Sequence, residues 1–244
     1  AGTQDPPQVV LVEQYNGSTW TEIADVAQAR ETLAAGGTTT SALAFGGGVG
    51  GTNYGNTESW DGSSWTELAN LNSGRRGTTG LGASNTACLC VGGYTSTQVA
   101  LTEKWNGSGW TEVADLNTAR SGNLASGGVY TSALAFGGTN PTPARTAQTE
   151  SWNDTCWSEV ADLNTAADNL MGAGSDKDNA LRFGGYNGTI NFAITELWNG
   201  TCWSEQNDLS TGVRTSGDAG SQTAAISFGG VNPSAARVGV SEEW

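Results

Sequence analysis

The chain has 244 residues, of which 36 are glycine and only 14% are charged, and its formal net charge is −14. Ten lysine and arginine residues in all provide no basic patch for nucleic acid, and no apolar run is long enough to cross a bilayer. Histidine is absent, so the usual general base and the commonest metal ligand are missing. We therefore expect no cofactor, no metal site, no nucleic-acid partner and no membrane insertion.

One phrase recurs along the chain: an acidic residue, an aromatic residue two places later, a short turn, and then Trp-x-Glu. In the first copy these residues are Glu13, Tyr15, Trp20 and Glu22. The first aromatic residues are Tyr15, Trp60, Trp105, Trp152, Trp198 and Trp244, so the period is 45 to 47 residues. The second aromatic residues are Trp20, Trp65, Trp110, Trp157 and Trp203. A fixed period of this length predicts a repeat architecture in which all ten tryptophans are structural.

Each unit contains four strand-like segments. The first follows an arginine and is rich in Gly and Ala, and the second ends in Gly-Gly, as at Phe45-Gly-Gly. The third ends at the Glu-x-aromatic, and the fourth starts at the second Trp. Between the third and fourth segments stands Asn-Gly or Asp-Gly, or Asn153-Asp154 in one unit. Such pairs favour positive φ and are the strongest short hairpin signal.

Four short antiparallel strands cannot bury both faces of a sheet alone, and units of this length arranged radially form a β-propeller. We therefore predict an all-β fold: one domain, a five-bladed β-propeller of four-stranded antiparallel blades. Small residues of the first two strands are expected near the axis, and the Trp residues in the wider outer gaps between blades. The expected units are 27–71, 72–116, 117–163, 164–209, and 210–244 completed by 1–26.

We expect the ring to close by pairing of the N- and C-terminal strands, with Trp20–Ala24 as the last strand of the fifth blade. Both Val9–Tyr15 and Val238–Trp244 match the third strand of that blade, and only one of them fits a closed ring. The other would lie outside as an extra strand or pair with a neighbouring molecule. In the second case the protein would be a filament subunit assembled by strand exchange.

Each unit resembles the kelch repeat, and the resemblance extends over nearly the whole chain. It rests on a fixed order of features: an arginine, a Gly- and Ala-rich strand, an aromatic-Gly-Gly, a Glu-x-aromatic and a downstream Trp. The strands here are shorter, and Phe or Val stands before Gly-Gly where kelch units often have Tyr. The resemblance implies a β-propeller. The near-identical units also resemble tandem repeats of structural proteins of marine bacteriophages.

Most charges belong to the repeat. Fifteen of the 24 acidic residues recur at fixed positions, such as Glu58 two places before Trp60. An arginine series precedes the first strand, and we expect its members to pair with repeat carboxylates: Arg30, Arg75, Arg120 and Arg214. The fourth unit has Ala167-Asp168 at this place. A catalytic arginine cluster is the alternative interpretation, but no acid–nucleophile pair accompanies it.

The loops between the second and third strands differ among all five units and are expected on one side of the disc. Function on a rigid scaffold usually lies in such loops. The candidate ligand-binding residues in them are aromatic, amide and arginine side chains: Tyr54, Tyr94, Asn140, Arg145, Tyr186, Asn187, Phe192, Asn232 and Arg237. These groups suit recognition of a protein or a glycan surface, although loops that simply vary would look the same.

Four cysteines give no metal spacing. Cys88 and Cys90 lie two apart on one inner strand and are expected to be buried thiols, whereas Cys156 and Cys202 precede Trp in adjacent blades. Neither pair is well placed for a disulfide, so the redox compartment stays open. Five asparagines begin an Asn-x-Ser/Thr pattern: Asn16, Asn106, Asn153, Asn187 and Asn199. All of them except Asn187 are hairpin residues.

These observations favour a non-enzymatic interaction or structural module displayed on an extracellular, virion or cell surface. The chain begins Ala-Gly-Thr, and we expect a processed or trimmed product from which any export signal would already be gone. The alternatives are a multivalent carbohydrate-binding lectin, a filament subunit that self-associates through its terminal strands, and a glycan-cleaving enzyme. The last is disfavoured by the lack of histidine and of a clustered acid pair.

Overall fold

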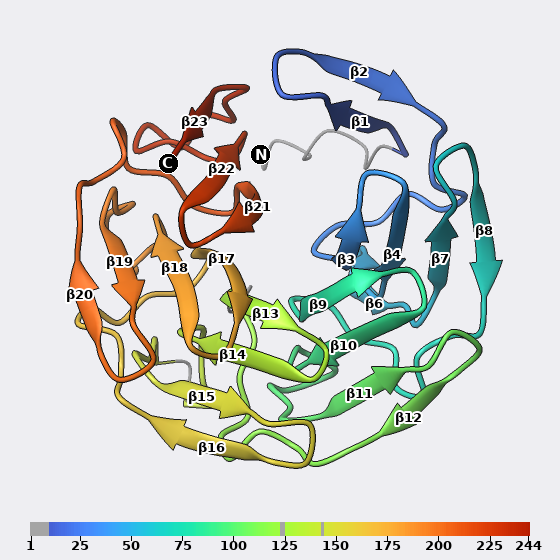
Figure 1. Ribbon diagram of the computed structural model, residues 1–244, viewed down its shortest axis with the longest axis horizontal. Coiled ribbons are helices and arrows are strands. Elements are labelled where there is room, and N and C mark those ends of the chain that lie inside the picture. Colours follow the sequence, from blue (N-terminus) through green and yellow to red (C-terminus); the bar gives the residue numbers. More distant parts are fainter. Residues whose placement is uncertain (1–9, 123–124, 143) are drawn as a thin grey trace.

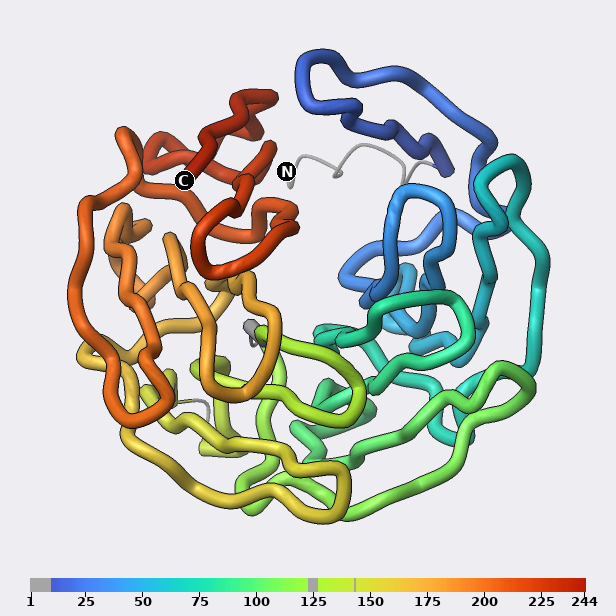
Figure 2. Tube along the Cα trace, viewed as in Figure 1, coloured from blue at the N-terminus to red at the C-terminus, as the bar shows by residue number. Residues whose placement is uncertain are grey.

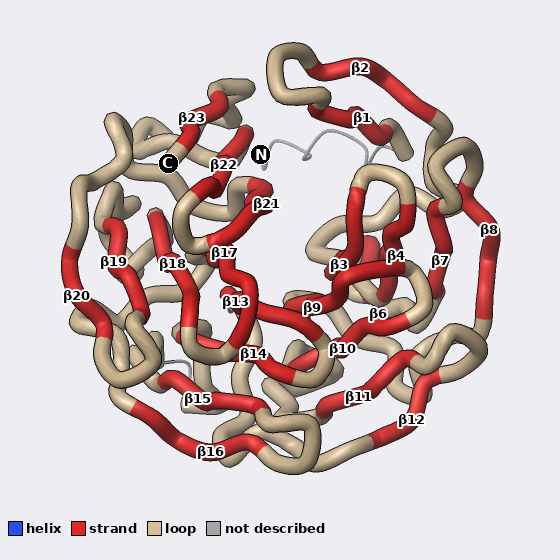
Figure 3. The backbone as a smooth tube through the Cα atoms, viewed as in Figure 1, coloured by secondary structure: helices blue, strands red, loops and turns tan. Residues whose placement is uncertain are grey.

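The computed structural model describes residues 10–122, 125–142 and 144–244. Twenty-three strands follow one another around a central axis, and the described residues contain no helix (Figure 1, Figure 3). The prediction of an all-β, five-bladed propeller is confirmed. Val9, the first residue of the expected N-terminal strand, lies outside the described residues.

Four blades are antiparallel four-stranded sheets in which sequence neighbours pair. Blade 1 contains β3 (Ala34–Thr38), β4 (Ser41–Phe45), β7 (Thr57–Trp60) and β8 (Trp65–Leu68). Blade 2 contains β9 (Thr79–Ser84), β10 (Ala87–Val91), β11 (Thr102–Trp105) and β12 (Trp110–Glu112). Blade 3 contains β13 (Ala125–Val129), β14 (Ser132–Phe136), β15 (Thr149–Trp152) and β16 (Trp157–Val160). Blade 4 contains β17 (Met171–Asp176), β18 (Asn179–Phe183), β19 (Thr195–Trp198) and β20 (Trp203–Glu205).

The remaining strands form three smaller sheets. Blade 5 has three strands in the described residues: β21 (Gly217–Ser221), β22 (Ala224–Phe228) and β23 (Ser241–Glu243). Among the described strands, the N-terminal β1 (Val12–Tyr15) and β2 (Trp20–Ile23) pair only with each other. A loop of blade 1 carries the two-residue strands β5 (Gly48–Val49) and β6 (Thr52–Asn53).

Positive φ at one position and an acceptor side chain at another explain the hairpin turns. The second turn residue has a left-handed φ in every unit, from 74° at Asp154 to 96° at Gly62. The residue before it accepts two backbone N–H bonds through its side-chain oxygen, as Asn16 does from Ser18 and Thr19 at 2.9 and 3.0 Å. Asp154 takes this conformation without glycine because Asp tolerates it.

Inner strands meet closely at the axis. A Cβ atom at Gly36 of blade 1 would lie 2.9 Å from the backbone nitrogen of Gly82 in blade 2, so only glycine fits there. The inner strands β3, β9, β13, β17 and β21 together line an axial channel of about 700 Å³. The small residues of the first strands therefore lie where the repeat pattern predicts.

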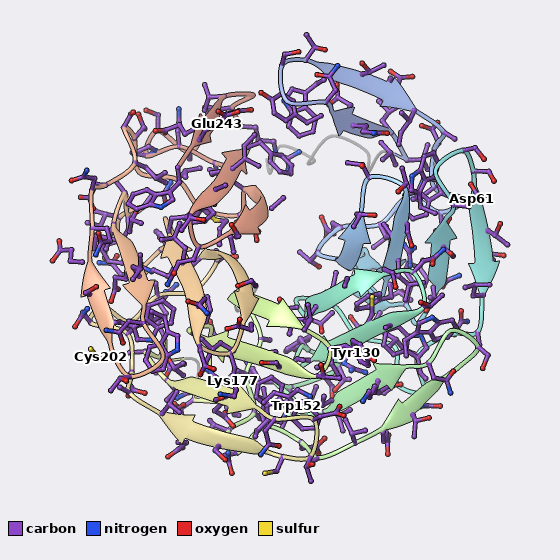
Figure 4. All side chains as sticks on the ribbon, viewed as in Figure 1. Asp61, Tyr130, Trp152, Lys177, Cys202 and Glu243 are labelled. Atoms are coloured by element: carbon purple, nitrogen blue, oxygen red, sulfur yellow. The ribbon has the colours of Figure 1, made fainter. Side chains whose placement is uncertain are left out.

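Tryptophans fill the outer gaps between blades, as predicted. The first Trp of a unit is anchored within its own blade: the Trp152 indole N–H donates to the Tyr130 carbonyl at 3.1 Å. The second reaches the preceding blade: Trp157 donates to the Thr102 hydroxyl at 3.0 Å. Figure 4 shows Trp152 among the packed side chains, and its exposed fraction is 0%. Removing such a side chain from a core costs roughly 3–5 kcal/mol.

Buried arginines pair with the repeat glutamates in the first three blades. The ion pairs are Arg30–Glu58 at 2.7 Å, Arg75–Glu103, and Arg120–Glu150 at 2.9 Å. Each guanidinium also donates to the carbonyl of the first Gly of Gly-Gly, as Arg30 does to Gly46 at 3.1 Å. The expected pairing is confirmed for these three blades.

The prediction for Arg214 is wrong by one position. In each of blades 1 to 4, the second Gly of Gly-Gly donates its backbone N–H to a carbonyl at the arginine position of the next blade. The residues that accept this bond are Arg75, Arg120, Ala167 and Val213, so Val213 holds the arginine position of blade 5. In blade 4 the missing charge comes from β18: the buried guanidinium of Arg182 lies 3.5 Å from Glu196. The arginine has moved from the connecting loop to the second strand, and its charge still reaches the same glutamate.

Ring closure by strand pairing is also wrong for the described residues. The slot of the third strand in blade 5 is taken by β23, and β1 and β2 pair with neither β22 nor β23. The chain ends meet through side chains: the Trp20 and Phe228 rings are 4.8 Å apart, and Tyr15 Oη donates to Glu243 at 3.2 Å. In Figure 2 the β1–β2 hairpin and β23 lie on opposite sides of the opening in the ring.

Candidate functional site

The two faces of the disc differ. One face, here the turn face, carries the short uniform turns between strands one and two and between strands three and four. The other, here the loop face, carries the variable loops after strand two and the connections into the next blade. Four of these loops close through isolated β-bridges, for example Thr139 with Arg145 and Tyr186 with Asn191. The variable loops therefore lie on one side, as predicted.

Three candidate asparagines hold their own loops. The Asn140 side-chain oxygen accepts the backbone N–H of Thr142 and Ala144, both at 3.1 Å. The Asn187 oxygen accepts from Thr189 and Ile190, and the Asn232 oxygen accepts from Ser234 and Ala236. Their acceptor atoms are already used, so these residues shape the loops.

The other candidates divide into packing and surface residues. Phe192 packs on the core between blades 3 and 4 and lies over the Arg182 guanidinium, 5.7 Å from ring centroid to Cζ. Tyr54 is half-buried, and its backbone joins Gly47 to Arg75. Tyr94 lies under the Arg76 guanidinium at 5.1 Å. Arg237 is exposed beside its bridge partner Val231.

A compact charged group forms where blades 3, 4 and 5 meet on the loop face. The Tyr186 ring is contacted by two guanidinium groups, with Arg145 Cζ 5.0 Å and Arg214 Cζ 4.2 Å from the ring centroid. Arg145 Nε lies 3.2 Å from Asp168 Oδ2, and that oxygen also accepts from the Thr139 hydroxyl at 3.0 Å. We call Arg145, Asp168, Tyr186 and Arg214 the two-arginine cluster.

The cluster is part of a one-sided distribution of cations. Of the ten lysine and arginine residues, four arginines are buried within blades: Arg30, Arg75, Arg120 and Arg182. The two lysines lie on the turn face. Lys104 pairs with the hairpin residue Asp154, and Lys177 pairs with Asp178 in the turn after β17. The remaining four arginines all belong to the loop face: Arg76, Arg145, Arg214 and Arg237.

Sequence reasoning found Arg145 and Tyr186 but missed their partners. Arg214 was assigned to the structural series, and Asp168 was noticed only as a departure from it. Both residues lie one place after the structural arginine position of their unit. The residue at this place forms a β-bridge with the residue that follows Gly-Gly. Aligning the units on that bridge, with Arg76 and Tyr94 in blade 2, would have paired Asp168 with Tyr186.

The axial channel contains one acid that stands apart. Asp218 of β21 lines the channel and is exposed to it. Desolvation raises the pKa of its carboxyl group to about 7, and the Gly172 N–H, at 3.4 Å from Asp218 Oδ2, acts in the opposite direction. Alanine and glycine from the other inner strands form most of the channel wall.

The cysteines are free thiols. Cys88 and Cys90 are buried as predicted, and Cys156 and Cys202 are exposed on the hairpin turns. Burial raises the pKa of the Cys88 thiol to about 12. Over the described ranges, no group of three or more Cys, Asp or Glu residues is placed to hold a metal ion. The same ranges contain no helix of the length and apolarity needed to span a membrane.

Comparisons with known proteins support the fold. No family model matches the chain, and no curated protein matches it. A solved structure described as "Structure of YjhT" is similar with a TM-score of 0.79 and 13% sequence identity. The similarity covers 95% of this chain and 87% of that chain. At this identity the likeness shows the fold alone.

Proposed function

We propose that the protein is a non-enzymatic binding module that recognises acidic groups of a protein or glycan surface through its loop face. The single observation that supports this most strongly is the two-arginine cluster. Two guanidinium groups share one tyrosine ring, and among the described residues Asp168 is the carboxylate paired with Arg145. In a chain of net charge −14, such a group favours an anionic partner.

The surrounding geometry supports binding at this place. Arginine and tyrosine are, with tryptophan, the residue types enriched at binding hot spots, because guanidinium forks pair with carboxylates and aromatic rings supply rigid area. The cluster lies on loops held by the β-bridges Thr139–Arg145 and Tyr186–Asn191. Rigid loops lower the entropy lost on binding.

We further propose that the five units are kelch-like repeats and that the module is displayed on an extracellular, virion or cell surface. The recurring buried Arg–Glu pair, the Gly-Gly and the downstream Trp support the first proposal. A propeller that presents one variable face on a rigid frame suits the second.

An array carrying acidic and neutral glycans beside acidic and neutral peptides tests the binding proposal. We expect the wild type to prefer the acidic members, and Arg145→Gln with Arg214→Gln to weaken that binding at least tenfold. Lys104→Gln with Lys177→Gln is the matched control, because it removes the same charge from the turn face and leaves the loop face intact. Equal loss in both double variants, or no preference for acidic members, contradicts the proposal.

A further inference from the structure

Within the described residues, blade 5 has no outer strand of the kind that blades 1 to 4 possess. In the described residues β23 pairs with β22 on one side, and its other edge has no partner strand. Unpaired edges present rows of backbone N–H and C=O groups and accept added strands. The question is which strand this edge fits.

We call the contact between two neighbouring blades a seam. The seams between blades 1 and 2, 2 and 3, and 3 and 4 show how an outer strand is held against the preceding blade. The indole N–H of the second Trp donates to a threonine hydroxyl at the start of the preceding third strand: Trp110 to Thr57 at 2.9 Å, Trp157 to Thr102 at 3.0 Å, and Trp203 to Thr149 at 3.1 Å. Where that blade has Phe before Gly-Gly, the indole also packs edge-on against it. Phe136 and Trp203 have ring centroids 4.9 Å apart.

The seam between blades 4 and 5 has the same phenylalanine and threonine, but in the described residues no tryptophan indole donates to that threonine. Its phenylalanine is Phe183 and its threonine is Thr195, and both line a pocket completed by Ala225, Ser227 and Trp244 of blade 5. Thr195 is 1% exposed, and its hydroxyl has no hydrogen-bond partner among the residues that the structure describes. The unpaired hydroxyl is therefore in the position that accepts an indole N–H in the other three seams.

The protein's own β2 strand does not lie in this pocket. Trp20 contacts Phe228, which faces away from blade 4, whereas Ala225 and Ser227 face the pocket. The hairpin is also tied to blade 1, because the Trp65 indole N–H donates to the Ala24 carbonyl at 3.0 Å. Blade 5 itself therefore separates Trp20 from Thr195.

We infer that the edge of β23 and the pocket beside it accept the β2 strand, Trp20–Ile23, of a second copy of this chain. Among the described strands, β2 is the Trp-x-Glu strand that is not part of a four-stranded blade. In the complex, β2 pairs with β23 of the other copy in place of its own β1. This exchange is feasible because a two-stranded hairpin is by itself only marginally stable. The acceptor continues the row of blade–blade seams already present in the molecule.

The register of the complex follows from blade 4. There Trp198 pairs with Trp203 and Glu196 with Glu205. The same offset places the donated Trp20 opposite Trp244 and the donated Glu22 opposite Glu242. The indole then enters the pocket, packs against Phe183 and donates to the Thr195 hydroxyl.

Analytical ultracentrifugation over a range of concentrations tests the exchange. We expect wild-type protein to form oligomers that grow with concentration. A donor-blocked variant, Trp20→Ala, and an acceptor-blocked variant, Ser227→Leu, are each expected to stay monomeric. Their mixture is expected to form dimers and nothing larger, because only one productive interface exists. Wild-type protein that stays monomeric, or variants that associate singly, overturns the inference.

A peptide experiment keeps the test independent of variant folding. A labelled peptide of residues 16–25 is titrated into the Trp20→Ala protein, and the same peptide with alanine at the Trp position is the control. We expect saturable binding of the first peptide only, weakened about fivefold by Thr195→Val in the protein, because one hydrogen bond is lost. Thr195→Val alone is expected to raise the melting temperature, since it removes an unpaired buried hydroxyl. If Thr195→Val leaves the affinity of the peptide unchanged, the proposed binding site of the donated strand is wrong.

Discussion

Two neighbouring seams, between blades 3 and 4 and between blades 4 and 5, have the same phenylalanine and threonine. They differ in whether a tryptophan packs against those residues. In the first, Trp203 fills the outer gap and donates to Thr149, with Phe136 beside it. In the second, Phe183 and Thr195 are present, but no indole of the described residues fills the gap, and Trp244 is 40% exposed. The comparison shows that the second tryptophan of a unit, rather than the strand ladder, completes the contact between neighbouring blades.

The largest expected effect separates these two seams directly. Trp203→Ala should lower the free energy of unfolding by roughly 3–5 kcal/mol, because a 5% exposed indole leaves a cavity. Trp244→Ala should lower it by less than about 1 kcal/mol, since much of that ring already contacts water. Urea unfolding followed by circular dichroism measures both. Similar losses would remove the distinction between the seams.

A second test compares a complete blade with blade 5 through their arginines. Arg120→Ala should destabilise the protein by about 3–5 kcal/mol, because Glu150 is left as an uncompensated buried charge. Arg214→Ala should change stability by less than about 1 kcal/mol, since its guanidinium lies on the surface over Tyr186. The measurement is denaturant unfolding at neutral pH. A large loss at Arg214 would restore it to the structural series.

The displaced arginine of blade 4 gives a third test. Arg182→Ala alone should destabilise the protein by about 2–4 kcal/mol, because Glu196 stays buried and unpaired. Ala167→Arg added to it should recover stability to within about 1 kcal/mol of the wild type. The recovery is expected because Arg182 Nε and Nη2 have no hydrogen-bond partners in the described part of the chain, whereas arginines at the loop position donate to backbone carbonyls. An additive loss in the double variant would show that the two positions are not equivalent.

The smallest effect concerns the channel acid. The folded-state pKa of Asp218 lies above its usual 3.8, so the folded protein keeps this proton to higher pH than the unfolded chain. Stability is therefore lost as pH rises from about 4 to about 7. Asp218→Asn should remove that loss and raise the melting temperature more at pH 8 than at pH 4. The difference should correspond to less than about 1 kcal/mol, because channel water screens the exposed carboxylate.

Much of the fold was predictable because the repeat encodes it locally. The hairpin pairs, the glycines at the axis and the tryptophans between blades follow from residue type and spacing within a single unit, as at Asp61-Gly62 or Gly36. Ring closure was not predictable in the same way. Val12–Tyr15 and Ser241–Trp244 carry the same Glu-x-aromatic pattern, and sequence alone could not show that β23 takes the slot.

The candidate site was predictable only in part, because its members come from different positions in different units. Arg145 lies in a loop of blade 3, Tyr186 follows the Gly-Gly of blade 4, and Arg214 precedes the first strand of blade 5. Such a meeting depends on how consecutive blades are rotated about the axis. Hydrogen bonds that asparagines such as Asn140 make to their own loops were equally invisible in the sequence.

The indole-to-threonine bond has a consequence for how the chain can vary. In blades 1 to 4 each unit offers the same hydroxyl to the unit after it, and Trp110, Trp157 and Trp203 each offer the same indole to the unit before. The glutamate that braces each blade is bonded within its own unit, as Glu150 is to Arg120. Exchanging the order of internal units therefore keeps this one bond at each junction, whereas loop-face contacts such as Arg145–Asp168 depend on which units are neighbours.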